Sequence, residues 1–161
     1  MLDEILKILP LDIVKEIKSM GGNGEITEIR LRVGKKARVI TSNIEIKLEY
    51  IVTLANLLDI LVKVSKNSIY AIQNEINNGF VVIKGGHRIG ICGEVILENG
   101  KIKNIKNINS MNIRIARQIF GAADKVMPYI VQNNCINNTL IVSPPRLWKN
   151  NYFKRYYKTN K

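Results

Sequence analysis

The spacing of apolar residues at the start of the chain changes from a helical to an extended period. Apolar side chains at positions 2, 5, 6 and 9, and then at 13, 14 and 17, recur at helical spacing. Pro10 lies between the two groups and predicts two short helices, because proline removes a donor and clashes inside a helix. Residues 28–33 instead alternate strictly, with Ile29, Leu31 and Val33 on one face. This alternation predicts a half-buried strand.

The middle of the chain predicts two more helices, each with a recognisable end. Thr53 is expected to cap the first, because its hydroxyl can accept a hydrogen bond from a free N–H of the first turn. The residues expected to face inward from this helix are Leu54, Leu57, Leu58, Leu61 and Val62. The second helix is predicted over residues 68–77, and Gly79 would end it in a left-handed conformation.

Short strands and turns follow. The Asn99-Gly100 pair is typical of a type I′ turn, so residues 95–97 and 102–105 are expected to form a hairpin. Further strands are predicted over residues 37–40, 44–48, 80–83, 112–115 and 139–143, and a helix over 121–131. Helices combined with mixed or antiparallel strands and hairpins indicate an α+β domain over residues 1–134. Residues 135–145 are expected to begin a separate α/β domain.

Half of the net charge of +12 lies in the last 16 residues of the chain. Residues 146–161 contain six basic residues and no acidic one, which leaves 19 basic against 13 acidic residues before them. So mild a positive charge does not predict a specific nucleic-acid binder. We recognise no signal peptide or membrane span, and Cys92 and Cys135 lack CxxC spacing, so we expect a cytoplasmic protein with reduced thiols. No metal site is expected, since His87 is the only histidine.

The end of the chain begins like a nucleotide-binding motif and then departs from it. Residues 138–145 predict a buried strand that runs into a loop at Ser143, Pro144 and Pro145. Such a strand usually leads to a phosphate-binding loop, which needs glycines, a lysine and a Ser or Thr to hold phosphate and Mg²⁺. The chain continues instead with a basic, aromatic tail that contains no glycine.

The genetic code suggests a specific hypothesis for this tail. Trp148 is encoded by TGG and the codon of Lys149 begins with AA, so a frame shifted by one base reads glycine there. The following codons of the shifted frame permit Lys-Thr-Thr-Ile-Leu, which would complete a Walker A loop opening a helix. We therefore interpret residues 146–161 as out-of-frame translation, caused by one extra base after Pro145.

The alternative is an authentic tail on a self-sufficient assembly or scaffold module. Aromatic residues at positions 148, 152, 153, 156 and 157 would share one face of a helix, among basic side chains. This pattern suits weak contact with an acidic membrane surface. It equally suits single-stranded nucleic acid, whose bases stack on aromatic side chains.

Five stretches of the chain together resemble one family. They are Glu28–Gly34, Ser68–Ala71, Gly79–Gly93, Ser110–Arg117 and Asn138–Pro145. In this order they are similar to the stage III sporulation protein AA family of endospore-forming bacteria. The resemblance implies an N-terminal domain followed by a RecA-like motor, as in secretion ATPases. Residues 135–145 would then be the first strand and loop start of an incomplete RecA-like domain.

The resemblance also implies cofactors and partners for an intact homologue. They are ATP and Mg²⁺, further copies of the chain in a homo-oligomeric, hexameric ring, and sporulation channel proteins at the mother-cell side of the forespore membrane. This chain has neither the Walker A lysine nor the Walker B acid, so we expect it to hydrolyse no ATP.

The same resemblance implies a role for two arginines. In secretion ATPases, arginines of the N-terminal domain approach the nucleotide phosphates, and the matching residues are Arg114 and Arg117. A guanidinium there could neutralise charge on a transferred phosphoryl group. The alternative is an exposed pair of basic residues at the end of a strand.

Other residues leave two interpretations open. The glycine-rich stretch could hold a loop that approaches a nucleotide, or only a tight turn. Its residues are Gly85, Gly86, His87, Arg88, Gly90 and Gly93. Arg30 and Arg32 could meet acidic residues of a neighbouring subunit, or simply be solvated. We further expect Arg88 to pair with Glu94, and Cys92 to be a buried thiol.

Overall fold

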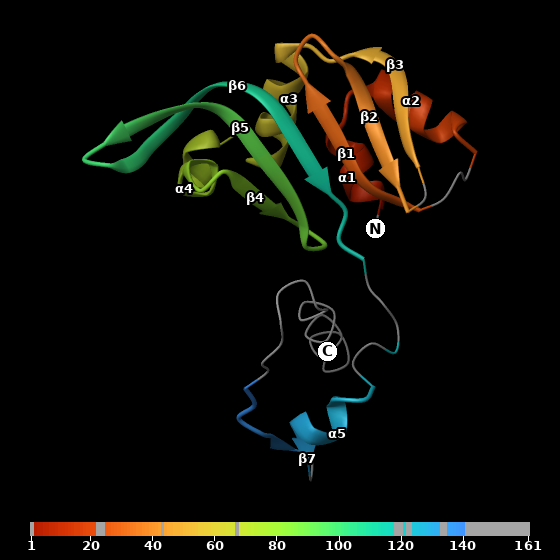
Figure 1. Ribbon diagram of the computed structural model, residues 1–161, viewed down its shortest axis with the longest axis vertical. Coiled ribbons are helices and arrows are strands. Elements are labelled where there is room, and N and C mark those ends of the chain that lie inside the picture. The colour runs from red at the N-terminus through yellow and green to blue at the C-terminus, as the bar shows by residue number, and fades with distance from the viewer. Residues whose placement is uncertain are drawn as a thin grey trace. The chain divides into compact units, whose positions relative to one another are not determined.

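The computed structural model of this 161-residue chain describes residues 2–21, 25–42, 44–66, 68–117, 121, 124–132 and 135–140. The chain divides into two compact units, Met1–Ala116 and Arg117–Lys161, and each is described by itself. Figure 1 shows that the first unit holds the main sheet and four of the helices. The domain boundary predicted at residue 134 concerns a motor domain and stays a prediction.

The first unit begins with the two predicted helices, α1 (Leu2–Ile8) and α2 (Leu11–Ser19). Pro10 separates them as expected and is the N-cap residue of α2. The apolar spacing also placed the buried side chains correctly, since Ile5 and Ile13 are fully buried. Glu16 of α2 accepts a hydrogen bond of 2.7 Å from the backbone N–H of Glu49, which supports the edge of the sheet.

Helix α3 (Leu54–Val64) starts at the predicted cap. The Thr53 hydroxyl accepts from the Asn56 N–H at 3.3 Å, and the Asn56 side chain accepts from the Thr53 N–H at 2.9 Å, which completes a capping box. The predicted inward set was partly wrong. The buried residues are Leu57, Ile60 and Leu61, whereas the side chains that remain exposed are Leu54, Leu58 and Val62. The buried stripe therefore includes Ile60, which the prediction omitted, and excludes Leu54, Leu58 and Val62.

The second predicted helix divides into two short pieces. A 3-10 turn, η1 (Ile69–Ile72), precedes α4 (Gln73–Asn77). Gly79 ends the segment at φ +78°, and its N–H donates to the carbonyl of Ile76 at 2.8 Å, as the left-handed glycine predicted.

Six antiparallel strands form the sheet in the order β3-β2-β1-β6-β5-β4. Their bounds are β1 Ile26–Arg32, β2 Lys36–Thr41, β3 Glu45–Ile51, β4 Phe80–Ile83, β5 His87–Glu98 and β6 Lys101–Arg114. The first and last strands of this unit therefore meet at the centre of the sheet, where β1 pairs with β6. This arrangement confirms the α+β class for the first unit.

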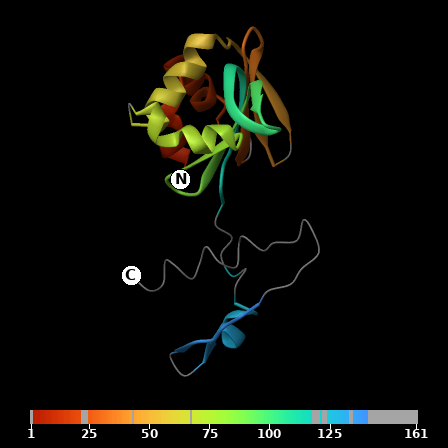
Figure 2. The same ribbon diagram turned by 90° about the vertical axis from the view of Figure 1, so that its left-hand side faces the viewer.

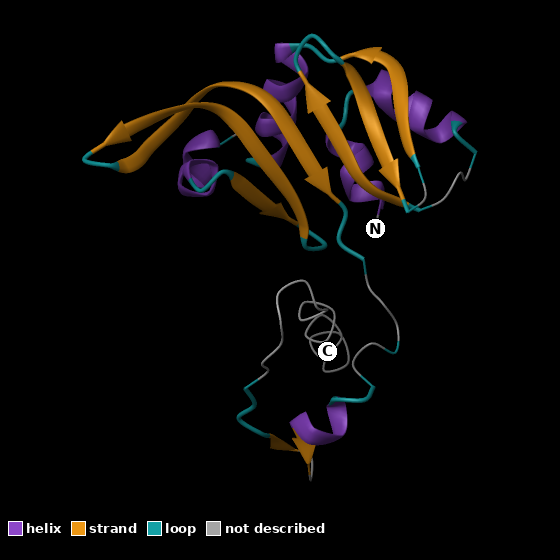
Figure 3. Cartoon of the chain, viewed as in Figure 1, coloured by secondary structure: helices purple, strands orange, loops and turns teal. Residues whose placement is uncertain are grey.

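Strands β5 and β6 form a long, curved hairpin (Figure 3). Asn99 and Gly100 both have positive φ at its tip, as the type I′ prediction requires. The predicted strands over 102–105 and 112–115 are parts of one strand, β6. Between the Cys92–Ser110 and Glu94–Lys106 pairs the register shifts, and Asn107 adopts φ +48°. This bulge bends the strand without ending it.

The helices lie on one face of the sheet, and none of the described residues of this unit forms a helix on the other face (Figures 1 and 2). Buried side chains from neighbouring strands form a continuous row beneath the helices. The members of this row are Val39, Ile29, Ile113, Ile89 and Val81. The alternating residues of the same strands point to the opposite, open face.

The described part of the second unit is small. It contains α5 (Met127–Ile130) and a two-stranded pair, β7 (Val131–Gln132) and β8 (Cys135–Ile136). The helix predicted over 121–131 is thus shorter in the described residues, where 121 and 124–126 form turns. Thr139 and Leu140 belong to no strand. The rest of the predicted strand, including Ser143, lies outside the described residues with Pro144 and Pro145.

Candidate functional site: an arginine-rich open face

The open face of the sheet carries most of the arginines of the first unit. The strict alternation in β1 places Glu28, Arg30 and Arg32 on this face, as the sequence predicted. Neighbouring strands add further charged residues at matching positions. They are Lys36 and Arg38 from β2, Glu45, Lys47 and Glu49 from β3, Arg114 from β6 and Arg88 from β5. Among these residues basic side chains outnumber acidic ones.

Glu28 is the acidic centre of this surface. Its carboxylate accepts a hydrogen bond from Nε of Arg30 and lies 3.6 Å from Nε of Arg114. The hydrogen bond and the charge of Glu28 raise the pKa of Arg30, with a smaller contribution from Glu45. Arg30 is therefore an ion-pair residue in this chain, rather than a freely solvated one.

A second set of ion pairs covers the side of the face formed by β2 and β3. Glu45 accepts from Arg38 at 2.8 Å and lies 3.7 Å from Arg30. Lys36 pairs with Glu49 at 2.5 Å. These pairs are solvent-exposed, so each contributes little to stability, on the order of 0 to 1 kcal/mol. Their effect is to offset the charges of Lys36 and Arg38, whereas Lys47 on the same half makes no ion pair in the described residues.

The other half keeps its positive charge. Arg88 stacks over the ring of Phe80, with the guanidinium carbon 3.7 Å from the ring centroid. Within the described residues no ion pair of Arg88 occurs, and the expected pairing with Glu94 is wrong. Both residues lie in β5, six positions apart, which separates them by about 20 Å in an extended strand. Glu94 accepts instead from the Asn107 side chain at 2.7 Å.

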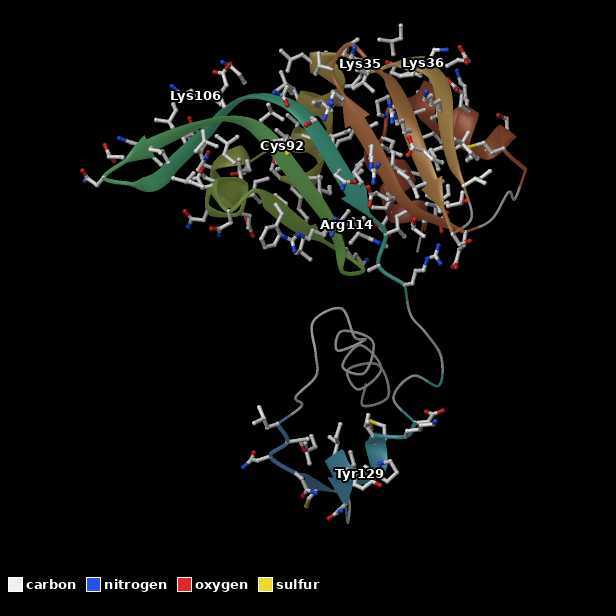
Figure 4. All side chains as sticks on the ribbon, in the orientation of Figure 1. Lys35, Lys36, Cys92, Lys106, Arg114 and Tyr129 are labelled. Atoms are coloured by element: carbon white, nitrogen blue, oxygen red, sulfur yellow. The ribbon has the colours of Figure 1, made fainter. Side chains whose placement is uncertain are left out.

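Arg88 lies directly opposite Arg114 in the ladder between β5 and β6. Opposed residues of an antiparallel pair have side chains on the same face, with Cβ atoms about 5 Å apart. The side chain of Arg114 is 67% exposed, and Figure 4 shows it at the end of β6. Two like charges in this position oppose each other. Their positive charges are only partly offset, because the single carboxylate of Glu28 pairs with both Arg114 and Arg30.

The glycine-rich stretch is a turn followed by a strand. Gly85 and Gly86 form the β4–β5 turn at φ +91° and +77°, whereas Gly90 and Gly93 lie within β5. His87 is fully buried, and its Nδ1 accepts from the backbone N–H of Ala116 at 3.0 Å. A Cβ on Gly85 would lie 2.7 Å from His87 Nε2. Because Gly85 has no side chain, the turn leaves room for the buried imidazole, which hydrogen-bonds the backbone just after β6.

The predictions for the two cysteines have definite outcomes. Cys92 is exposed on the open face, which contradicts the expected buried thiol, because β5 places it opposite Ser110 rather than toward the helices (Figure 4). Cys92 and Cys135 are both free thiols. Arg117 belongs to the second unit, and the shared role expected for Arg114 and Arg117 stays a prediction.

The remaining described surface offers no stronger site. Across the described ranges, no three His, Cys, Asp or Glu residues cluster to hold a metal ion. A hollow of about 370 Å³ lies beside α4 and is lined by Gln73, Ile96, Lys103, Asn104 and Lys106, but Gln73 and Asn104 already hydrogen-bond each other at 3.0 Å. None of the helices in the described part is long and apolar enough to cross a membrane.

Sequence reasoning identified Arg30, Arg88 and Arg114 singly but missed their arrangement. The alternation of residues 28–33 was visible in the sequence. The neighbours of these residues were not, because 68 residues separate β1 from β6 in the sequence. Only the pairing of strands places Arg88, Arg114 and Glu28 in one row.

Comparison with known proteins gives one consistent result. A family model described as "Sporulation stage III, protein AA" matches residues 2–158. The curated stage III sporulation protein AA of Bacillus subtilis (strain 168) is 37% identical over 150 residues, which cover 92% of this chain and 48% of that protein. The chain thus spans about half the length of this curated relative. No solved structure matches it.

Proposed function

The chain belongs to the sporulation stage III, protein AA family, and we propose that it is the N-terminal assembly domain of a ring-forming ATPase. In this proposal the intact protein serves a channel between mother cell and forespore, from the mother-cell side. The observation that carries the family assignment in this proposal is the match over residues 2–158. Because that match extends through residues 146–158, it does not support out-of-frame translation of the tail, which rests on the codon argument alone. About half of the Bacillus subtilis relative lies outside its match to this chain, which leaves room there for a motor domain.

The proposal gives the chain a structural rather than a catalytic role. ATP and Mg²⁺ would be bound by the motor of the intact protein, with Walker A beginning after Pro145. Residues 146–161 supply neither the glycines nor the lysine of that loop. We attribute this to one extra base after Pro145 that shifts the reading frame.

The role proposed for Arg114 uses its position at the end of β6. Its side chain is largely exposed and belongs to a rigid sheet, which suits a guanidinium that must reach a phosphate held by another domain. Arg117 remains the second candidate for this role. Ring assembly would bring a motor domain to the open face, from the same or a neighbouring subunit.

DNA sequencing across the codons for Ser143 to Lys161, and beyond them, tests this proposal. We expect one surplus base between the codons of Pro145 and Trp148, and an open frame downstream that continues through a Walker B acid. An intact frame, with a stop codon followed by no motor-like sequence, would make the tail authentic. The chain would then be a non-enzymatic binding module, and vesicle flotation with and without the tail would test contact with anionic membranes.

A further inference from the structure

We propose that the outer edge of β5, over residues 92–98, binds an extended segment of a partner protein as an additional strand. In the described part of the chain, no strand lies beside this edge. Strand β4 pairs with β5 only as far as Gly90, and the last bond on that side runs from the N–H of Ile91 to the carbonyl of Gly79 at 2.8 Å. Beyond this bond, the backbone of residues 92–98 bonds only to β6 within the described ranges, and Figure 1 shows the hairpin continuing past β4. The outward N–H and C=O groups of such an edge can pair with another strand.

Apolar side chains lie exposed along the same stretch. Successive residues of a strand alternate between its faces, so Val95 and Leu97 share one face of β5. Their exposed fractions are 50% and 62%, and Ile102, which opposes Leu97 from β6, is 49% exposed. The residues of the opposite face are Glu94, Ile96 and Glu98. An added strand would therefore cover apolar side chains on one face and meet two carboxylates on the other.

Strand β6 shows which sequence this stretch of β5 accepts opposite it. The residues of β6 that oppose positions 94 to 98, in that order, are Lys106, Ile105, Asn104, Ile102 and Lys101. They follow the order basic, apolar, polar, apolar, basic, and Lys103 is the additional residue of the register shift. An antiparallel strand on the outer edge would meet the same side chains of β5, because directly opposed residues share a face. The partner segment therefore requires the same order.

The charges at this edge favour a basic partner over a second copy of the chain. Glu94 accepts from the neutral amide of Asn107 at 2.7 Å, and it makes no ion pair in the described residues. Glu98 pairs with Lys103 at 2.6 Å, but both side chains are more than half exposed, so this pair is weak. In an antiparallel pair of two copies centred on Ile96, Glu94 of each copy would oppose Glu98 of the other. Like charges in directly opposed positions are destabilising.

Binding at this edge requires no motor domain, so its test is independent of the proposed function. The experiment is a titration of the full chain, monitored by two-dimensional NMR, with a synthetic peptide that contains the order Lys-Ile-Asn-Ile-Lys and has blocked ends. We expect saturable shifts centred on residues 92–98. A peptide with glutamates in place of both lysines should bind at least about fivefold more weakly, because two cross-strand charge pairs change from attraction to repulsion.

Two N-methylated forms of the same peptide separate strand pairing from contact between side chains alone. Each form carries methyl groups on alternate backbone nitrogens, so each keeps its N–H donors along one edge only. A strand added to β5 pairs through one edge of the peptide. One form should therefore bind like the unmodified peptide, and the other at least about tenfold more weakly, because it loses its hydrogen bonds to β5.

A charge-reversed protein tests the choice of partner. Glu94→Lys combined with Glu98→Lys should invert the preference, so that the glutamate peptide binds more tightly than the lysine peptide. Misfolding would weaken binding of both peptides and could not invert their order. Asp12→Lys combined with Asp59→Lys is the matched control. It changes the net charge equally at exposed positions of α2 and α3, so binding of either peptide should change by less than about twofold.

Three results would overturn this inference. They are the absence of a saturable shift at residues 92–98, equal binding of the two N-methylated forms, and an unchanged preference in the charge-reversed protein. Self-association of the chain through the same residues, without any peptide, would also overturn it, because the edge would then bind a second copy. Failure of the proposed function would look different, since the peptide would bind while the gene would contain no frame for a motor.

Discussion

Ile29→Ala should lower the free energy of unfolding by about 3 to 4 kcal/mol, because it removes a large side chain from the centre of the core. Ile29 is fully buried and lies between Val39 on β2 and Ile113 on β6. It therefore packs where β1 pairs with β2 on one side and with β6, a strand from later in the sequence, on the other. The sheet around it is continuous, and collapse into the space left behind would require several strands to move. Urea denaturation of the full chain measures the effect.

Arg32→Ala provides the matched control in the same strand. Arg32 is exposed on the open face and makes no ion pair in the described residues, so its removal should change stability by no more than about 0.5 kcal/mol. If the two variants were equally stable, β1 would not be the central strand of this core.

Gly93→Ala should destabilise the chain by about 2 to 3 kcal/mol, because the bulge between β5 and β6 leaves no space for a methyl group. A Cβ at this position would lie 2.4 Å from the carbonyl oxygen of Lys106 and 3.0 Å from Cα of Ile108. Both are backbone atoms, so relief requires movement of β6 itself. Thermal unfolding should show a midpoint lower by roughly 10 °C.

The control for this variant is another glycine of the same strand. A Cβ on Gly90 would meet Asn112 only at ordinary contact distances, the nearest being 3.7 Å. Gly90→Ala should therefore change stability by less than about 1 kcal/mol. Equal destabilisation by Gly90→Ala and Gly93→Ala would contradict this account. It would show that replacing any glycine of this strand, rather than the close contact at Gly93, lowers the free energy of unfolding.

Local patterns predicted the local parts of this fold. Pro10 between two helices, the cap at Thr53 and the turn at Asn99-Gly100 each depend on a few neighbouring residues, and all three were confirmed. Helix α3 shows where this reasoning becomes ambiguous. Its leucines and valine form two adjacent apolar stripes, and only packing against α1 and β6 selects Leu57, Ile60 and Leu61 for burial.

Features that depend on distant residues were not predictable from spacing. The bulge opposite Gly93 shifts the register of β6, so a single long strand resembled two short ones in the sequence. Cys92 lies between apolar neighbours and yet is exposed, because successive residues of a strand alternate between faces. The opposition of Arg88 and Arg114 likewise exists only after β5 and β6 have paired.

The central proposal is that these residues form the N-terminal domain of an ATPase and that one extra base after Pro145 shifts the reading frame of the tail. Its most direct test is Mg²⁺-dependent ATP hydrolysis by two products of the same gene, expressed as found and with one base removed between the codons of Pro145 and Trp148. The account predicts a longer protein that hydrolyses ATP from the corrected gene, and no hydrolysis by the 161-residue chain. Hydrolysis by the uncorrected chain, or a corrected frame that yields no active motor, would contradict it.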